Sequence, residues 1–464
     1  MVNTFNDSPI VKLFLYEGRY FIYDAFLNRI IEVSKEQYLE VLELVKIGLS
    51  KYTSLDRNTN SYNDIKMLIT KGMFRTCFVD KIQHPETEHV ANYLRRCIKE
   101  LTLQVAKTCN FKCRYCSQHN SFVFNKEGQN LNMPWEVAKK SLEFLRNHSL
   151  DARTIELSFY GGEPLLNFIL IAKSVKYAEK LFQTKKINYR MTTNGSLLQG
   201  HILDFIVEHN FKLSISLDGP ELVQNQHRKF AEDGKGTFEI VYNNVMVLKH
   251  KYEKYFLEQV SFLPAILLDE NRDYIFRFFD ELGVINENIS PLEIDLAGTD
   301  YIYSTPDNVE KNVFTLSPLD KHYKMSGEME KHLEEIYGAK TVISKKWHPN
   351  GMCIPGVKLL FVDTNGIFYP CEKIQEHDIF SIGSIEQGLN IDKIVNFMNI
   401  GKLTEAECKT CWALRFCEMC ISSCVDIEKN QITKEHKLKS CDEQKALTLN
   451  FFKKYLNKRI CKHT

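Results

Sequence analysis

Three cysteines, Cys109, Cys113 and Cys116, lie in one short stretch, separated by three and then two residues. Residues 101–105 before them alternate as a β-strand does, so the thiols are expected on a loop at the carboxyl end of that strand. A β/α barrel carries its chemistry at that end. A structural zinc site uses four ligands, whereas three thiolates suit a [4Fe–4S] cluster whose fourth iron stays open to a substrate. For this spacing alone, a zinc knuckle or three unrelated buried thiols remains the alternative.

A second group of cysteines occupies the last quarter of the chain. Residues 357–371 are typical of a β-hairpin with an Asn365-Gly366 turn and a cysteine near each end. So many clustered thiols would oxidise unless metals held them, which predicts metal binding, and two zinc-ribbon sites are the alternative. The thiols concerned are Cys353, Cys371, Cys408, Cys411, Cys417, Cys420, Cys424 and Cys441.

The composition excludes several classes of protein. The chain has 464 residues, enough for two to four domains, and its 44% hydrophobic and 26% charged residues are typical of soluble proteins. A net charge of +1 favours neither nucleic acid nor a membrane surface as a partner. The sequence shows no signal peptide and no bilayer-spanning stretch, so we expect a cytoplasmic protein, in which clustered cysteines bind metals.

Changes in pattern along the chain predict four parts. Residues 1–95 carry three strand-like segments, a helix that begins after Ser34, and a second helix at 61–71. Strands and helices alternate over residues 96–300, which predicts an α/β fold, a partial (β/α)6 barrel. Residues 301–345 are a polar bridge with a helix at 318–337, and residues 346–464 form the cysteine-rich domain.

The barrel strands are expected to end in residues that let ligands approach the backbone. Six strands are predicted, at 101–105, 154–159, 187–193, 212–217, 260–264 and 292–296, with a helix at 134–147 after the first. The residues singled out at or after the strand ends are Gly161, Gly162, Glu163, Asn194, Ser216 and Arg228.

The cysteine loop, with Tyr115 before its last thiol, and the Gly161-Gly162-Glu163 turn resemble the motifs of radical S-adenosylmethionine (SAM) enzymes. The resemblance implies that Cys109, Cys113 and Cys116 hold a [4Fe–4S] cluster whose free iron chelates SAM. The reduced cluster would cleave SAM to a 5′-deoxyadenosyl radical. The turn would meet the SAM ammonium, with Glu163 as its anionic acceptor.

The same resemblance implies further SAM contacts. Tyr115 would lie against the adenine, and Ser216 would reach the ribose. Asn194, at the end of the third strand, is assigned to the cofactor site. Arg228 stands where many relatives carry an arginine that pairs with the SAM carboxylate, but their preceding His-Asp is absent. A solvated arginine on a helix therefore remains the alternative for Arg228.

The C-terminal cysteines resemble the SPASM domain, which holds two auxiliary [4Fe–4S] clusters. The resemblance assigns one cluster to Cys408, Cys411, Cys417 and Cys441, and the other to Cys353 and Cys371 with one or two later thiols. The family pattern places a thiol where this chain has Ile421, and Cys420 and Cys424 flank that position instead. Either both complete the cluster, or one is spare and leaves an iron open to a substrate thiolate.

Together these motifs resemble maturases of ribosomally made peptides, most closely the thioether-forming type. Residues 1–95 resemble a winged-helix-like element that takes a leader peptide as an added strand, and a packing domain without a partner is the alternative. The implied partners are a leader-bearing precursor peptide and a flavodoxin- or ferredoxin-type electron donor. The alternative functions are peptide epimerisation, carbon–carbon crosslinking, cysteine or serine oxidation on a sulfatase, and a non-catalytic metal-binding module.

Overall fold

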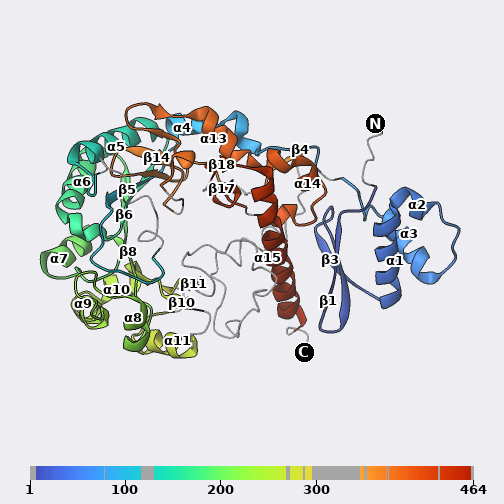
Figure 1. The fold of residues 1–464 in the computed structure, drawn as a ribbon, viewed down its shortest axis with the longest axis horizontal. Coiled ribbons are helices and arrows are strands. Elements are labelled where there is room, and N and C mark those ends of the chain that lie inside the picture. Colours follow the sequence, from blue (N-terminus) through green and yellow to red (C-terminus); the bar gives the residue numbers. More distant parts are fainter. Residues whose placement is uncertain are drawn as a thin grey trace.

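The structure is a computed structural model in which the described parts form an open arch. The N-terminal unit lies at one end of the arch with the long helix α15 (Lys434–Ile460) beside it, and the β/α part lies at the other end (Figure 1). The predicted helix at 318–337 and nearly all of the predicted bridge fall outside the described residues. Those are 7–77, 79–116, 130–267, 272–285, 288–294, 345–349, 353–372, 374, 376–417, 419–426 and 429–460.

A nine-stranded sheet forms the centre of the β/α part, in the order β16-β15-β14-β13-β5-β6-β7-β8-β9. Neighbouring strands from β5 to β9 run parallel, and helices alternate with them along the chain. This confirms the predicted α/β class with a parallel sheet. The five parallel strands are β5 (Glu100–Ala106), β6 (Thr154–Gly161), β7 (Lys186–Thr193), β8 (Lys212–Ile215) and β9 (Val260–Phe262).

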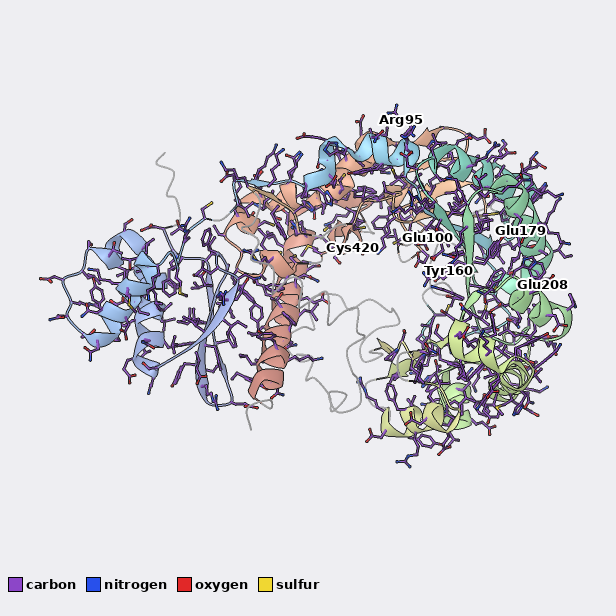
Figure 2. All side chains as sticks on the ribbon, turned by 180° about the vertical axis from the view of Figure 1, so that it is seen from behind. Arg95, Glu100, Tyr160, Glu179, Glu208 and Cys420 are labelled. Atoms are coloured by element: carbon purple, nitrogen blue, oxygen red, sulfur yellow. The ribbon has the colours of Figure 1, made fainter. Side chains whose placement is uncertain are left out.

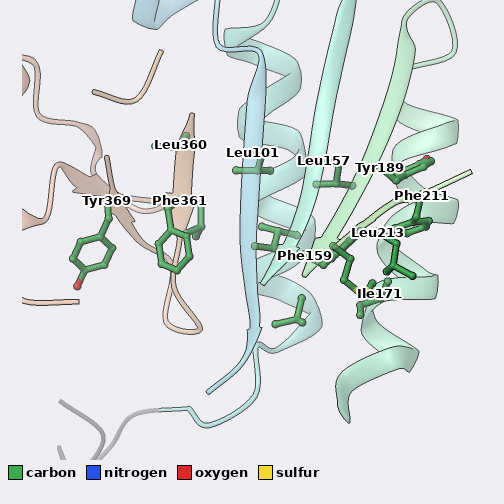
Figure 3. Packing of buried hydrophobic residues seen from close by; sticks show 14 of the residues in the cluster. Leu101, Leu157, Phe159, Ile171, Tyr189, Phe211, Leu213, Leu360, Phe361 and Tyr369 are labelled. Carbon is green, nitrogen blue, oxygen red and sulfur yellow. The ribbon is translucent and has the colours of Figure 1, made fainter. Parts of the chain in front are cut away.

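Helices cover the outer face of this sheet through an apolar core (Figures 1 and 3). Leu157 and Phe159 of β6 are buried in one apolar cluster. Leu213 of β8 and Ile171 of helix α6 belong to the same cluster. Because side chains alternate along a strand, this core fixes the register of the strands. The loops that leave their carboxyl ends are thereby brought to one edge. The covering helices are α5 (Trp135–His148), α6 (Phe168–Leu181), α7 (Gly200–Glu208) and α9 (Phe238–Lys251).

The cysteine-rich part contributes strands to the same sheet. Strand β13 (Leu360–Val362) pairs parallel with β5, with Leu360 opposite Leu101, and the two lie side by side in Figure 3. The predicted hairpin is confirmed, because β14 (Ile367–Tyr369) pairs antiparallel with β13 across the turn at Gly366. The β/α part and the hairpin therefore share one sheet and one core.

The sixth predicted strand lies beside the continuation of the fifth. Strand β11 (Leu292–Ile294) pairs parallel with β10 (Ala265–Leu267) in a separate two-stranded sheet. Pro264 stands between β9 and β10, and a proline cannot donate a ladder hydrogen bond. Among the described strands, the sheet is consequently interrupted there.

The N-terminal unit matches the elements predicted for it. Strands β1 (Val11–Tyr16), β2 (Arg19–Asp24) and β3 (Arg29–Val33) form an antiparallel sheet, followed by helix α1 (Lys35–Ile47). Ser34 caps α1 in a capping box: its hydroxyl accepts from the Gln37 N–H, and the Gln37 side chain accepts from the Ser34 N–H. Helix α2 spans Leu49–Thr53 and α3 spans Asn60–Thr70.

The two faces of this N-terminal sheet bury different partners. One face packs on α1 and α3 around Val41 and Ile65. The other face packs on helix α15, where the ring centroids of Tyr23 and Phe452 are 4.5 Å apart. The loop between Cys411 and Cys417 also joins this contact, because Phe416 packs on the same rings. The N-terminal unit is thus docked on the cysteine-rich part.

Shorter elements complete the described chain. No helix in the ranges given above combines the length and the apolar character needed to cross a membrane. The remaining helices are α4 (Val90–Arg96), α8 (Glu221–His227), α10 (Glu253–Gln259), α11 (Arg272–Glu281), α13 (Ile391–Met398) and α14 (Glu405–Lys409). The remaining strands are β4 (Lys81–Ile82), β12 (Lys346–Trp347), β15 (Gly383–Ser384), β16 (Gly388–Leu389), β17 (Val425–Asp426) and β18 (Gln431–Ile432).

Candidate active site and cysteine clusters

The Cys109–Cys116 loop leaves the carboxyl end of β5 and is held by backbone hydrogen bonds. The Lys112 N–H donates to the Lys229 carbonyl at 2.8 Å, and the Arg114 N–H donates to the His227 carbonyl at 2.9 Å. Phe111 also forms a bridge with Phe230, and their rings meet edge to face at 5.1 Å. These contacts fix the loop against the segment that follows α8.

Hydrogen-bond donors point at two of the three thiols. The Cys109 sulfur accepts from the Phe111 N–H at 3.3 Å and lies 3.8 Å from the Asn194 side-chain amide. The Cys113 sulfur lies 3.9 Å from the Arg228 guanidinium. Burial raises the pKa of Cys109 to about 11 and that of Cys113 to about 12, and both are raised further by Cys116. Donors aimed at close, buried thiols suit thiolates bound to a metal centre, which deprotonates its thiol ligands.

The two glycines of the Gly161-Gly162-Glu163 turn lie against the backbone of the cysteine loop. A Cβ at Gly161 would fall 1.9 Å from the Ala106 carbonyl oxygen, and one at Gly162 would fall 2.3 Å from that of Thr108. The Gly162 N–H donates to the Ala106 carbonyl, and the Glu163 N–H donates to that of Thr108, both at 2.9 Å. Glycine is therefore required at both positions so that β6 can approach the loop before Cys109.

Gly162→Ala is expected to destabilise the protein by about 3 kcal/mol or more, because its Cβ meets backbone that can move only with the cysteine loop. Thermal unfolding measures the loss, and iron content reports on the loop. The matched control is Gly234→Ala, where a Cβ has no atom within 4 Å but φ is +70°. That variant reports backbone strain alone and should keep its iron. Equal iron loss in both variants would contradict the explanation.

Glu163 is fully buried and hydrogen-bonded to protein groups. Its carboxylate accepts from the Leu165 N–H at 3.0 Å, the Thr193 hydroxyl at 2.7 Å and the Asn194 N–H at 2.7 Å. Burial raises the pKa of Glu163, and the three donors oppose this effect; the resulting pKa is about 7. The side chain therefore joins the end of β6 to the end of β7.

Asn194 continues this connection toward the cysteine loop. Its side-chain amide donates to the Asn110 side-chain oxygen at 2.8 Å and lies near the Cys109 sulfur. Its own side-chain oxygen accepts from the Ser196 N–H and hydroxyl. Ser216, at the end of β8, is half-buried, and its N–H donates to the Thr193 carbonyl. The structure thus places Glu163, Asn194 and Ser216 around one strand end.

Arg228 forms a buried ion pair with Asp218, a residue that sequence reasoning had not singled out. The guanidinium donates to both carboxylate oxygens of Asp218, at 2.9 and 3.0 Å. The Tyr115 hydroxyl bonds to the same carboxylate, and Arg228 stacks 5.3 Å over the Tyr115 ring. Asp218 also accepts from the Ala265 N–H. This network anchors the loop residue Tyr115 and holds Arg228 beside Cys113.

A second buried ion pair links the same region to the cysteine-rich part. The Lys107 ammonium, two residues before Cys109, lies 2.6 Å from a Glu376 carboxylate oxygen, and both side chains are largely buried. Gln104 of β5 bonds to Glu376 as well. Sequence reasoning missed this contact, because nothing local relates Lys107 to a residue so far along the chain.

Seven of the eight C-terminal thiols fall into two neighbourhoods. Burial raises the pKa of Cys411, Cys417 and Cys441, and each is raised further by Cys408. Cys411 also interacts with Cys441 and Cys417, so these four thiols lie close together. They are the four that the family resemblance assigns to one cluster.

The other neighbourhood contains Cys420, which lies toward the inner edge of the arch with Glu100 and Tyr160 (Figure 2). Cys420 interacts with Cys353 and with Cys424. Cys424 is fully buried, interacts with Cys417 and Cys441 as well, and so lies between the two neighbourhoods.

The part of the chain described here contains no preformed set of ligands for a single metal ion. No three Cys, His, Asp or Glu side chains among these residues converge closely enough to hold one ion. A four-iron cluster keeps its thiolates farther apart, because each thiolate binds a different iron. Sets of three and four thiols are the donors that iron–sulfur clusters use, so the residues present fit such clusters.

Residues 103–282 match the family model of the Radical SAM superfamily. This span runs from β5 to the end of α11 and contains the cysteine loop, the glycine turn and the Asp218–Arg228 pair. The chain therefore carries a radical SAM superfamily domain, which implies SAM and one [4Fe–4S] cluster. It is 22% identical over 342 residues to the cysteine-type anaerobic sulfatase-maturating enzyme of Clostridium novyi, which covers 69% of this chain and 85% of that enzyme.

Solved structures share the fold. The structure of anSMEcpe with bound AdoMet and Kp18Cys peptide has a TM-score of 0.55 at 22% identity and covers 74% of this chain and 95% of that chain. Streptococcus suis SuiB bound to S-adenosylmethionine has a TM-score of 0.50 at 14% identity, and covers 92% of this chain and 97% of that chain. The second likeness extends over nearly the whole chain. The chain thus carries a radical SAM superfamily domain and is similar to anaerobic sulfatase-maturating enzymes.

Proposed function

We propose that the protein is a radical SAM maturase that installs a thioether in a ribosomally made, leader-bearing peptide. The bond joins a cysteine sulfur to a side chain or an α-carbon. One observation carries the proposal: a radical SAM loop with donors aimed at its thiols shares a sheet with a cysteine-rich part that holds eight more thiols. Such a chain has groups both to make a radical and to accept an electron afterwards.

Cys109, Cys113 and Cys116 would hold the cluster that binds SAM. When bound, the cluster and SAM supply a 5′-deoxyadenosyl radical that removes a hydrogen atom from the peptide. The Phe111 N–H and the Arg228 guanidinium orient and stabilise the thiolates of Cys109 and Cys113. The proposed auxiliary ligands are Cys408, Cys411, Cys417 and Cys441 for one cluster, and Cys353, Cys371, Cys420 and Cys424 for the other. A flavodoxin- or ferredoxin-type protein would deliver the electrons.

The SAM contacts follow from the strand ends. Gly161 and Gly162 carry no side chains, so a ligand can approach the backbone of the turn after β6. Tyr115 and Ser216 are proposed to contact the adenosine of SAM. Glu163 is proposed as the anionic acceptor of the SAM ammonium, and its bond to the Asn194 N–H also positions that strand end. Two nitrogens of the Arg228 guanidinium already donate to Asp218. We therefore propose that the arginine binds SAM only through its remaining donors.

Residues 1–95 are proposed to bind the leader peptide, ahead of the SAM core at 96–300, the bridge at 301–345 and the SPASM part at 346–464. Within the described chain, β1 and β3 each pair with β2 alone, so both are edge strands. An edge strand can accept an extended peptide by main-chain hydrogen bonds. The faces of this sheet are occupied by α1 and α15, which leaves its edges for the peptide.

A second candidate function is oxidation of a cysteine or serine on a sulfatase, because the chain is similar to proteins named cysteine-type and serine-type anaerobic sulfatase-maturating enzymes. The two functions leave different products. A thioether costs the peptide two hydrogen atoms and one alkylatable thiol. Oxidation of a cysteine to an aldehyde removes its sulfur, and either aldehyde product reacts with hydrazines, which a thioether does not.

The test is co-expression with the short cysteine-rich peptide encoded nearest to this gene, followed by mass spectrometry. We expect a loss of two hydrogen atoms per crosslink and a cysteine that no longer alkylates. A variant with Cys113→Ala serves as the inactive control. A peptide of unchanged mass that takes up solvent deuterium would show epimerisation, and a hydrazine-reactive product would show sulfatase-type oxidation. Either result would overturn the thioether proposal.

A further inference from the structure

Lys437 is a buried cation that forms no ion pair with a carboxylate among the described residues. It lies in the first turn of α15 and is 1% exposed. Its ammonium donates to the Thr404 hydroxyl at 2.5 Å and lies 3.8 Å from the Cys408 sulfur. Among the described residues, no carboxylate oxygen lies within 4.0 Å of it. Burying an unpaired ammonium costs several kcal/mol, so a negative charge is expected beside it.

Among the described residues, a thiol rather than a carboxylate lies in contact with the Lys437 ammonium. Glu407 of α14 is the nearby carboxylate; it is half-buried, pairs with Lys434 at 2.5 Å, and interacts with Lys437 electrostatically without forming an ion pair. His348 is buried, and burial lowers its pKa to about 3, so it is neutral. Lys445, farther along α15, is itself positive and pairs with Asp442.

The thiols, in contrast, surround Lys437. The Cys408 sulfur is in contact with it, and the Thr404 hydroxyl bridges the two at 3.2 Å from that sulfur. The Cys441 thiol, one helical turn after Lys437, donates to the Lys437 backbone carbonyl. Lys437 also lowers the pKa of Cys441, Cys417 and Cys424, against the effect of burial. Four thiolates outweigh the positive core of a [4Fe–4S] cluster, so a cluster at this position carries the missing negative charge.

We propose that Lys437 compensates the charge of the cluster held by Cys408, Cys411, Cys417 and Cys441, and that it raises the reduction potential of this cluster. The inference rests on the proposed auxiliary cluster. Reduction adds one electron from the reductant and makes the cluster more negative. A fixed positive charge in a low-dielectric interior stabilises that state more than the oxidised one. Lys437 thereby favours the cluster as the acceptor of the electron that the substrate releases.

The test is a redox titration followed by electron paramagnetic resonance. It uses the full chain with Cys109, Cys113 and Cys116 replaced by alanine, so that the core cluster does not contribute. In this background, Lys437→Met is expected to lower the ratio of reduced to oxidised cluster at a fixed potential by about tenfold or more, which is a shift of about 59 mV for one electron. Lys437→Arg keeps the charge and should stay near the parent value. Lys434→Met removes an exposed charge three residues earlier and is the matched control.

The outcomes separate this inference from the proposed function. If the parent background binds no iron, the auxiliary clusters are refuted and the inference with them. If iron is bound but Lys437→Met leaves the potential unchanged, or shifts it no more than Lys437→Arg does, only the inference is refuted. If Lys437→Met binds no iron at this site, restored iron and potential in Lys437→Arg would support the charge role. Failure of arginine to restore them would refute it.

Discussion

Cys113→Ala is expected to abolish cleavage of SAM. Changes to groups around a metal ligand typically cost ten- to a hundredfold in affinity or activity, so loss of a ligand itself should cost more than about a hundredfold. The remaining two thiols would leave a second iron open beside Arg228, which now faces the Cys113 sulfur. Release of 5′-deoxyadenosine by the reduced protein measures the effect.

Cys97→Ala provides the control for Cys113→Ala. Cys97 is half-buried and lies apart from both thiol groups, and its sulfur is 3.9 Å from the Asp151 carboxylate. We expect it to keep full iron content and activity. Iron content gives a second readout, since Cys113→Ala should lose about a third of the iron if three four-iron clusters are present. Wild-type SAM cleavage by Cys113→Ala would contradict the assignment of the loop.

Asp218→Ala is expected to produce the largest loss of stability. It leaves the Arg228 guanidinium, whose side chain is only 10% exposed, without its carboxylate. Breaking a buried ion pair from one side costs about 3–5 kcal/mol, because the other charge stays buried and uncompensated. Tyr115 and the Ala265 N–H lose an acceptor at the same time. Thermal and chemical unfolding measure the change.

Two further variants isolate the cause of the Asp218→Ala effect. Asp204→Ala removes an exposed carboxylate that pairs with Lys251 at 2.6 Å, and should cost less than about 1 kcal/mol. Combining Asp218→Asn with Arg228→Met removes both charges, and should recover part of the stability lost in Asp218→Ala. A double variant that is no more stable than Asp218→Ala would show that packing, rather than the uncompensated charge, dominates at this position.

Local features of the fold could be predicted from the sequence because their causes are local. The Asn365-Gly366 turn supplies a glycine with φ of +86°, and the hairpin forms around it. Ser34 and Gln37 stand three residues apart and cap α1. The alternation of strands and helices after residue 96 likewise follows from the periodicity of apolar residues.

Long-range contacts could not be predicted, because no local pattern encodes them. The pairing of Leu360 with Leu101 places the C-terminal hairpin in the central sheet, although its sequence indicates only a hairpin. The docking of Tyr23 on Phe452 depends on a helix whose sequence is largely polar. In each case the tertiary contact decides which edge or face is covered.

The candidate site shows the same division. The spacing of Cys109, Cys113 and Cys116 indicated a cluster loop, and the paired glycines indicated close approach of backbone. The partners of the charged residues stayed hidden. Asp218 reads as a turn residue before Gly219-Pro220, yet it neutralises Arg228. Lys437 stands in a charged stretch that is typical of a solvated helix face, yet it is buried among thiols.

The central claim is that the Cys109–Cys116 loop holds a cluster that cleaves SAM. The most direct measurement is an anaerobic assay of reconstituted protein with SAM and a reductant, with release of 5′-deoxyadenosine quantified beside the metal content. We predict iron in the protein and 5′-deoxyadenosine that is absent when Cys109, Cys113 and Cys116 are replaced together. Protein that binds zinc but no iron and leaves SAM intact would contradict the claim.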